Sequence, residues 1–173
     1  MKKFISILLL VFTMTPLAWA QEEIPVPQVS TNPQVVSYDS SAAMKPVALD
    51  GFFFKVPDVC EVTKAADGHI VAKAPDGSFG ITAAIYEVDS SNKLTQKTCR
   101  DLAREMRVNK EKISAFEVNK LKGHRLTGTL ESRDVNAAAI GNGKNKMLVI
   151  AVLSRPYKKQ RSVQVIESVE YKK

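Results

Sequence analysis

The sequence predicts an α+β domain in which a single, mostly antiparallel sheet of hairpins is covered by a helix on each face. Three observations support this α/β/α sandwich. Short segments of alternating apolar residues are separated by the turn signals Asp67-Gly68 and Asn142-Gly143, because both central residues of such a turn need positive φ. The segment 147–153 is apolar on both faces and therefore needs cover above and below. Two segments with apolar residues at helical spacing supply that cover.

The first 20 residues have the three parts of a cleavable export signal. Lys2 and Lys3 precede an apolar run, and the small residues Ala18 and Ala20 occupy the positions that a signal peptidase requires. The run is too short to span a bilayer, which argues against an uncleaved anchor. No later segment is apolar enough to span one. We therefore expect an exported protein, periplasmic or secreted, without a transmembrane segment after cleavage.

A flexible arm and a single domain are expected after the signal. Residues 21–48 contain Pro25, Pro27 and Pro33 among polar side chains and show no lasting helical or strand period, which is typical of an extended arm. One domain is expected over residues 49–173, because this length suits one modest core.

The first half of this domain reads as strands joined by tight turns. Alternate residues in 52–56 share one apolar face. Residues 70–73 pair back across the Asp67-Gly68 turn. A further turn at Pro75-Asp76-Gly77 leads into the strand 79–88, which is largely apolar on both faces.

A helix is predicted next, since four apolar residues recur at offsets of three and four: Cys99, Leu102, Ala103 and Met106. Thr95 is its expected N-cap, with Ser91 and Asn92 as alternatives. The closing segment 157–171 is expected to be the second covering helix. The spacing of its valines also fits a strand, so that alternative stays open.

Further strands complete the predicted sheet. Residues 116–121 and 124–131 are expected to be two strands separated at Gly123. Residues 137–140 and 146–154 form the last hairpin, around Asn142-Gly143.

The two cysteines, Cys60 and Cys99, are predicted to form a disulfide, because the compartment is oxidising and both lie on faces expected to point inward. The bridge would tie the helix to the strand at Cys60. Two buried free thiols and a redox pair are the alternatives. The spacing of the two residues does not match the Cys-x-x-Cys pattern of redox pairs.

Four short matches carry a resemblance to a known fold family: Phe52-Phe53-Phe54-Lys55-Val56-Pro57, Ser78-Phe79-Gly80-Ile81, Gly123 with Leu126 and Gly128, and Val165-Ile166-Glu167-Ser168-Val169. With the order of elements, they resemble the PsbP-like fold, which is named for an extrinsic subunit of photosystem II and shared with a small Ran-binding nuclear-import factor. Many exported bacterial proteins look similar. The resemblance implies protein binding or assembly support more often than catalysis, and it assigns no functional residue.

The chain is basic, with a formal charge of +7 that falls to +5 once Lys2 and Lys3 leave with the signal. We expect an exported basic protein to contact another protein or an anionic envelope surface, and not nucleic acid. The sequence does not predict an oligomeric state.

Two basic clusters are the candidate contacts for an anionic partner. The first lies on one face of the predicted helix, opposite its apolar stripe, and the second follows the last strand. The six residues are Arg100, Arg104, Arg107, Arg155, Lys158 and Lys159. The alternative is a solvated face in which Asp101 and Glu105 are interspersed.

No catalytic, cofactor-binding or metal-binding residue is predicted. His69 and His124 lack a His, Cys or carboxylate at a ligand-like offset, and the residues around Ser78 lack the spacing of a nucleophile elbow. The sequence favours an exported, non-enzymatic binding or assembly protein of the cell envelope. A small exported hydrolase and a carrier of an apolar or anionic ligand are the alternatives. A pocket converging on His124 would favour the enzyme, and an apolar cavity would favour the carrier.

Overall fold

The computed structural model describes residues 43–89 and 91–172, without the side chains of residues 91–93. The predicted signal and most of the predicted arm lie outside the described residues. The chain divides into a unit of residues 1–41 and a unit of residues 42–173. The second unit holds every strand and helix described below.

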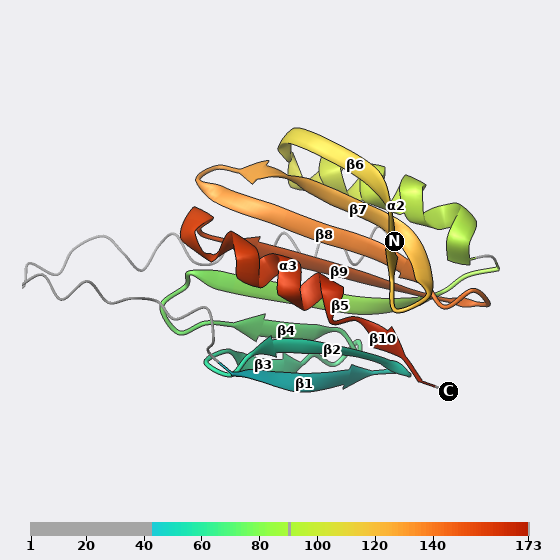
Figure 1. Ribbon diagram of the computed structural model, residues 1–173, viewed down its shortest axis with the longest axis horizontal. Coiled ribbons are helices and arrows are strands. Elements are labelled where there is room, and N and C mark those ends of the chain that lie inside the picture. The colour runs from blue at the N-terminus through green and yellow to red at the C-terminus, as the bar shows by residue number, and fades with distance from the viewer. Residues whose placement is uncertain (1–42, 90, 173) are drawn as a thin grey trace, which may run out of the picture. The chain divides into compact units, whose positions relative to one another are not determined.

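A seven-stranded sheet forms the centre of this unit (Figure 1). Its strands are β3 (Glu61–Lys64), β4 (Ile70–Lys73), β5 (Phe79–Glu87), β6 (Asn109–Val118), β7 (Leu121–Leu130), β8 (Arg133–Gly141) and β9 (Lys146–Ser154). They are ordered β3-β4-β5-β9-β8-β7-β6, and every neighbouring pair is antiparallel. The predicted antiparallel hairpins at Asp67-Gly68 and Asn142-Gly143 are confirmed. The predicted two-residue turns are wrong, because the loops are longer and only the glycine of each pair has positive φ.

A second, three-stranded sheet corrects the prediction of a single sheet. It consists of β1 (Met44–Leu49), β2 (Phe52–Pro57) and β10 (Glu170–Tyr171), in the order β1-β2-β10. A tight turn at Asp50-Gly51, with positive φ at both residues, folds β1 back on β2. This hairpin packs its apolar face on the larger sheet and does not extend it. The first strand among the described residues, β1, thus begins at Met44, inside the segment that we predicted as part of the arm.

The larger sheet is covered differently on its two faces (Figure 1). Helix α2 (Ser91–Met106) packs on one face, mainly against β7 and β8. The other face is shared by the small sheet and helix α3 (Lys159–Glu167), which follows a 3-10 turn, η1 (Pro156–Lys158). The prediction of one helix on each face was incomplete, because strands β1, β2 and β10 cover part of the second face. The closing segment is a helix as predicted, apart from β10.

Two apolar layers follow from this arrangement. Between the large sheet and the small sheet with α3, the core includes Phe52, Phe54, Ile81, Ile150 and Ile166. Under α2, the predicted stripe is buried: Cys99, Leu102, Ala103 and Met106. Because β9 lies at the centre of the sheet, alternate residues of its sequence are buried in each layer.

The predicted Cys60–Cys99 disulfide is wrong. Both cysteines are buried free thiols. Cys60 belongs to the core that faces the small sheet, whereas Cys99 lies under α2, where its Sγ donates to the carbonyl of His124 at 3.3 Å. The large sheet separates the two residues. Both side chains do point inward, but into different layers, so the alternative of two buried thiols is correct.

Two glycines of β7 are needed for close packing and not for a turn. The β6–β7 hairpin turns at Asn119-Lys120, both with positive φ, so the predicted break at Gly123 is wrong. A Cβ on Gly123 would lie 2.1 Å from the carbonyl oxygen of Ala139. A Cβ on Gly128 would lie 2.4 Å from Cγ1 of Val108, so this glycine lets the start of β6 approach β7.

Candidate functional site

The C-terminal end of α2 is held by an arginine in an unusual backbone conformation. Arg107 has a φ of 54°. Its N–H donates to the carbonyl of Arg104 at 3.1 Å, and the N–H of Val108 donates to the carbonyl of Ala103 at 2.9 Å. This is the Schellman pattern, in which glycine is the usual residue at the left-handed position. Arginine there costs about 1 kcal/mol relative to glycine. The cap turns the chain directly from α2 into β6.

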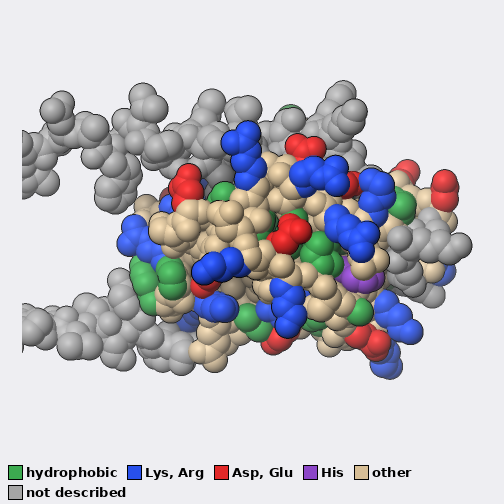
Figure 2. All heavy atoms as spheres, turned by 90° about the horizontal axis from the view of Figure 1, so that it is seen from above, with side chains coloured by type: hydrophobic (Ala, Val, Ile, Leu, Met, Phe, Trp, Pro, Cys, Tyr) green, Lys and Arg blue, Asp and Glu red, His purple; other side chains and the backbone are tan. Residues whose placement is uncertain are grey.

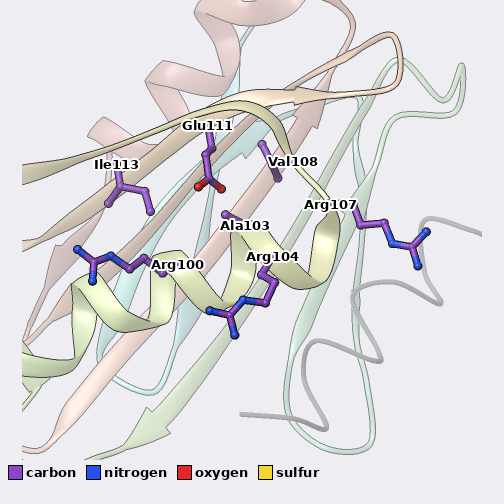
Figure 3. A pocket seen from close by; sticks show the side chains of 7 residues that line it. All are labelled: Arg100, Ala103, Arg104, Arg107, Val108, Glu111 and Ile113. Atoms are coloured by element: carbon purple, nitrogen blue, oxygen red, sulfur yellow. The ribbon is translucent and has the colours of Figure 1, made fainter.

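A hollow of about 610 Å³ lies between the end of α2 and β6 (Figure 3). We call it the α2–β6 groove. Its lining residues are Arg100, Ala103, Arg104, Arg107, Val108, Glu111 and Ile113. The first predicted basic cluster therefore lines one concave surface. Alanine, valine and isoleucine side chains make part of that surface apolar.

The arginines of the α2–β6 groove are exposed, as the helical pattern predicted. Within the described part of the chain, no carboxylate lies within salt-bridge distance of Arg100, Arg104 or Arg107. Asp101, which could have neutralised this helix face, instead accepts from Lys97 at 2.6 Å. Figure 3 shows Glu111 pointing from β6 toward α2, Arg100 extending beneath Ile113, and Arg107 pointing away from the other two arginines. The groove thus presents three separated positive charges and one carboxylate.

The second predicted basic cluster is not one surface. Lys158 donates to Ser78 Oγ at 2.7 Å and lies 3.5 Å from an oxygen of Asp76, so it fastens η1 to the β4–β5 turn. The backbone N–H of Arg155 donates to the carbonyl of Ser78, and the side chain of Arg155 is exposed. Lys159 lines a different pocket, on the face of the sheet that α3 covers. The sheet separates this cluster from the α2–β6 groove.

The pocket lined by Lys159 contains cations that sequence reasoning missed. Lys110 and Lys112 reach it from β6, and Arg125 reaches it from β7. We call it the β6–α3 pocket. These residues are far from Lys159 in the sequence, and only the pairing of β6, β7 and β8 brings them together.

Ser78 and Thr95 are buried in hydrogen-bonded contacts, whereas His124 is half-buried. Ser78 is fully buried, and its hydroxyl donates to Asp76 Oδ1 at 2.6 Å while it accepts from Lys158. This hydrogen bond from Ser78 lowers the pKa of Asp76. Thr95, the predicted helix cap, lies four residues inside α2 and is buried, with its Oγ1 2.9 Å from Nδ1 of His124. Neither the groove nor the pocket is lined by His124.

The thiols are also unsuited to nucleophilic chemistry. Burial raises the pKa of Cys99 to about 11. Burial likewise raises the pKa of Cys60, against the opposing effect of Lys45. Among the described residues, no group of three or more His, Cys, Asp or Glu side chains is arranged to hold a metal ion. No helix in the described ranges is long and apolar enough to cross a membrane.

The two layers around a central antiparallel sheet define the class of the fold as PsbP-like. Among solved structures, the chain is similar to cyanobacterial PsbP (CyanoP) from Synechocystis sp. PCC 6803, with a TM-score of 0.57 and 11% identity over 76% of this chain and 94% of that one. This likeness confirms the fold that the sequence predicted, and at such identity it shows the fold alone.

Two further structures are less similar. A protein from Bacteroides thetaiotaomicron VPI-5482 has a TM-score of 0.48 and 11% identity, over 71% of this chain and 46% of that one. LpqN, involved in cell envelope biogenesis of Mycobacterium tuberculosis, has a TM-score of 0.46 and 16% identity, over 73% of this chain and 90% of that one. No protein-family model matches the chain, and no curated protein matches it in sequence.

Proposed function

We propose that this is an exported, non-enzymatic protein of the cell envelope that binds an extended acidic segment of a partner protein in the α2–β6 groove. The proposal rests on one observation above all. Arg100, Arg104 and Arg107 line a single hollow, and no described carboxylate is within salt-bridge distance of them. Export follows from the N-terminal signal pattern, and binding without catalysis is what the PsbP-like resemblance implies.

The charge of the groove indicates that the partner is negatively charged. Like charges on neighbouring helical positions repel each other slightly. The three arginines of the groove are all exposed to solvent. A carboxylate-rich partner would relieve the repulsion and form charge-assisted hydrogen bonds with the guanidinium groups.

Shape favours a protein segment over a lipid surface. The groove is concave, and of its apolar lining residues Ala103 and Val108 are buried while Ile113 is half-buried. Ile113 can pack on a side chain of a partner and would not meet a flat headgroup layer. The guanidinium group of Arg107 points away from those of Arg100 and Arg104 (Figure 3), and charges separated in this way suit an extended chain with several carboxylates. Strand β6 is also the last strand of the sheet, and such an edge can pair with an extended segment.

The test is a charge reversal with a matched control. Arg100→Glu combined with Arg104→Glu should weaken binding of an oligoglutamate peptide by about tenfold or more at low salt. Glu111→Gln should strengthen it, because one repelling carboxylate leaves the groove. The control, Lys64→Glu with Lys144→Glu, makes the same change in net charge at exposed positions outside the groove. Binding is measured by fluorescence anisotropy at low and moderate salt.

Three results would contradict the proposal. The reversed protein could bind the peptide as well as the parent does, or the control pair could weaken binding equally, which would indicate net charge only. The parent could also bind phosphatidylglycerol vesicles and not the peptide, which would make the groove a membrane contact. Each variant is first checked for an unchanged melting temperature, which the exposed positions predict.

A further inference from the structure

A second cationic hollow, the β6–α3 pocket, lies on the opposite face of the sheet from the α2–β6 groove. It encloses about 270 Å³ between the first turns of α3 and strands β6, β7 and β8. Its charged lining residues are Lys110, Lys112, Arg125, Lys159 and Asp134. Four cations therefore face a single carboxylate. This pocket plays no part in the proposed function, which concerns the other face.

A buried chain of hydrogen bonds forms one wall of the pocket. Arg125 Nε donates to Asn136 Oδ1 at 2.8 Å, and Asn136 Nδ2 donates to Ser162 Oγ at 3.4 Å. Ser162 Oγ in turn donates to the carbonyl of Lys159 at 2.7 Å. Asn136 is 3% exposed and Ser162 is 1% exposed. Buried polar groups of this kind fix the geometry of the residues that they contact, so Arg125 is held in place before any ligand arrives.

The guanidinium of Arg125 is only partly neutralised. It lies 5.7 Å above the ring of Phe116, and its burial lowers the pKa of the group. Its nearest carboxylate oxygen belongs to Glu167, at 3.9 Å from Nη1, and the Glu167 side chain is 56% exposed. A desolvated cation gains more from an anion than an exposed one does.

We propose that the β6–α3 pocket binds a small phosphate group, either inorganic phosphate or the terminal phosphate of a monoester. A planar guanidinium and several lysines around one small hollow suit a dianion with several acceptor oxygens. Thr127 and Thr129 also line the pocket. The hydroxyl of Thr129 donates to the carbonyl of Asn109, so Thr127 is the hydroxyl residue that can donate to such oxygens. A monocarboxylate would leave most of these donors without an acceptor.

The experiment titrates the purified protein with inorganic phosphate and follows backbone amides by NMR, at an ionic strength held constant with sodium chloride. Saturable shifts are expected at residues of β6, β7, β8 and the start of α3. Lys112→Gln combined with Lys159→Gln should weaken phosphate binding by about tenfold or more. Both positions are exposed, so the fold should be unchanged. Lys64→Gln with Lys144→Gln is the control, with the same change in net charge.

A second variant tests the pocket from its buried wall. Asn136→Asp is isosteric and keeps an acceptor for Arg125, but it adds a negative charge beside the guanidinium, so phosphate binding should be lost while the protein stays folded. The lysine pair decides the outcome if this variant does not fold. Glycerol 3-phosphate should bind as phosphate does if the site accepts monoesters, and weaker binding would restrict the site to inorganic phosphate.

The proposal is overturned by any of four results. These are no saturable shift above the chloride baseline, equal weakening by the control pair, shifts confined to the α2–β6 groove, and binding of acetate as tight as that of phosphate. The first three would leave the pocket without a ligand of this class. The last would show that the pocket binds any small anion, because the single charge of a carboxylate would be enough for binding.

Discussion

The α2–β6 groove and the β6–α3 pocket are both cationic and flank the same edge strand, yet they are built differently. In the groove, the arginines are exposed, and no described carboxylate lies within salt-bridge distance of them. In the pocket, Arg125 belongs to a buried hydrogen-bond chain that continues through Asn136 and Ser162. This difference indicates which of the cations contribute to the stability of the fold. Arg125 of the pocket wall is held by buried partners, whereas the arginines of the groove are exposed, and we expect their substitution to leave the fold unchanged.

A substitution of Gly128 should disturb both the α2–β6 groove and the β6–α3 pocket, because strand β6 lines both. A Cβ there would lie 2.4 Å from Cγ1 of Val108 and 2.7 Å from the carbonyl oxygen of Asn109. Gly128→Val should therefore push the start of β6 away and cost about 3 kcal/mol or more of unfolding free energy. Chemical denaturation measures this. Ala115→Val, at an exposed position of the same edge strand, is the control and should stay within about 0.5 kcal/mol. Equal stability of both variants would mean that β6 is not held closely.

Substitutions of Asn136 and Arg104 compare the stability of the pocket wall with that of the groove. Asn136→Ala removes the acceptor of Arg125 and the donor to Ser162, and should lower the unfolding free energy by about 2 kcal/mol. Arg104→Ala, in the groove, should change it by less than about 0.5 kcal/mol. Denaturation curves of the two variants, measured side by side, check the contrast. Similar losses in both would remove the distinction between a buried and a surface site.

Local patterns in the sequence predicted some of this architecture well. The stripe from Cys99 to Met106 is buried and the arginines beside it are exposed, because a helical period assigns both faces at once. The position of the hairpin at Asn142-Gly143 was likewise predicted from local turn residues, although only Gly143 has positive φ. In both cases the deciding interactions are between residues close in the sequence.

What the sequence did not predict depends on residues that are far apart. An alternating pattern identifies the apolar face of a strand but not the sheet that it joins, so the strand at residues 52–56 was assigned to a single sheet. Most of β1 was placed in the arm. The charged first half of β6 does not resemble a strand, because an edge strand need not be apolar. The β6–α3 pocket requires the register that sets Arg125 opposite Ala138 and Thr127 opposite Asn136. No local signal carries that register.

A substitution of Ser78 tests whether its contact with Asp76 and Lys158 stabilises the fold. Its hydroxyl is the main cause of the lowered pKa of Asp76, which also pairs with Lys158. A carboxyl whose folded pKa lies below its ordinary value of 3.8 stabilises the fold above that pH, and the gain is lost as the pH falls through the folded pKa. Ser78→Ala should therefore be less stable than the parent at neutral pH, with a difference that shrinks below pH 3.8. Thermal unfolding across this range measures it. A difference independent of pH would show that the hydrogen bond to Asp76 is not its cause.

The smallest expected effect concerns the two cysteines, one in each apolar layer, since we expect neither thiol to react in the native protein. Iodoacetamide should label neither Cys60 nor Cys99 in the native protein, because burial raises the pKa of both thiols and only the thiolate reacts. Both should be labelled after denaturation without reductant. A cross-linked peptide containing Cys60 and Cys99 in a non-reducing digest would contradict the placement of these residues on opposite faces of the sheet.

Separate occupancy of the two hollows is the most direct test. In one NMR sample of the purified protein, oligoglutamate should shift amides at the end of α2 and the adjoining part of β6. Inorganic phosphate, added next, should shift amides of β7, β8 and α3, and should displace the peptide no more than sodium chloride of equal ionic strength does. The result that would contradict two distinct sites is a single set of amides that responds to both anions, with phosphate displacing the peptide in proportion to its occupancy.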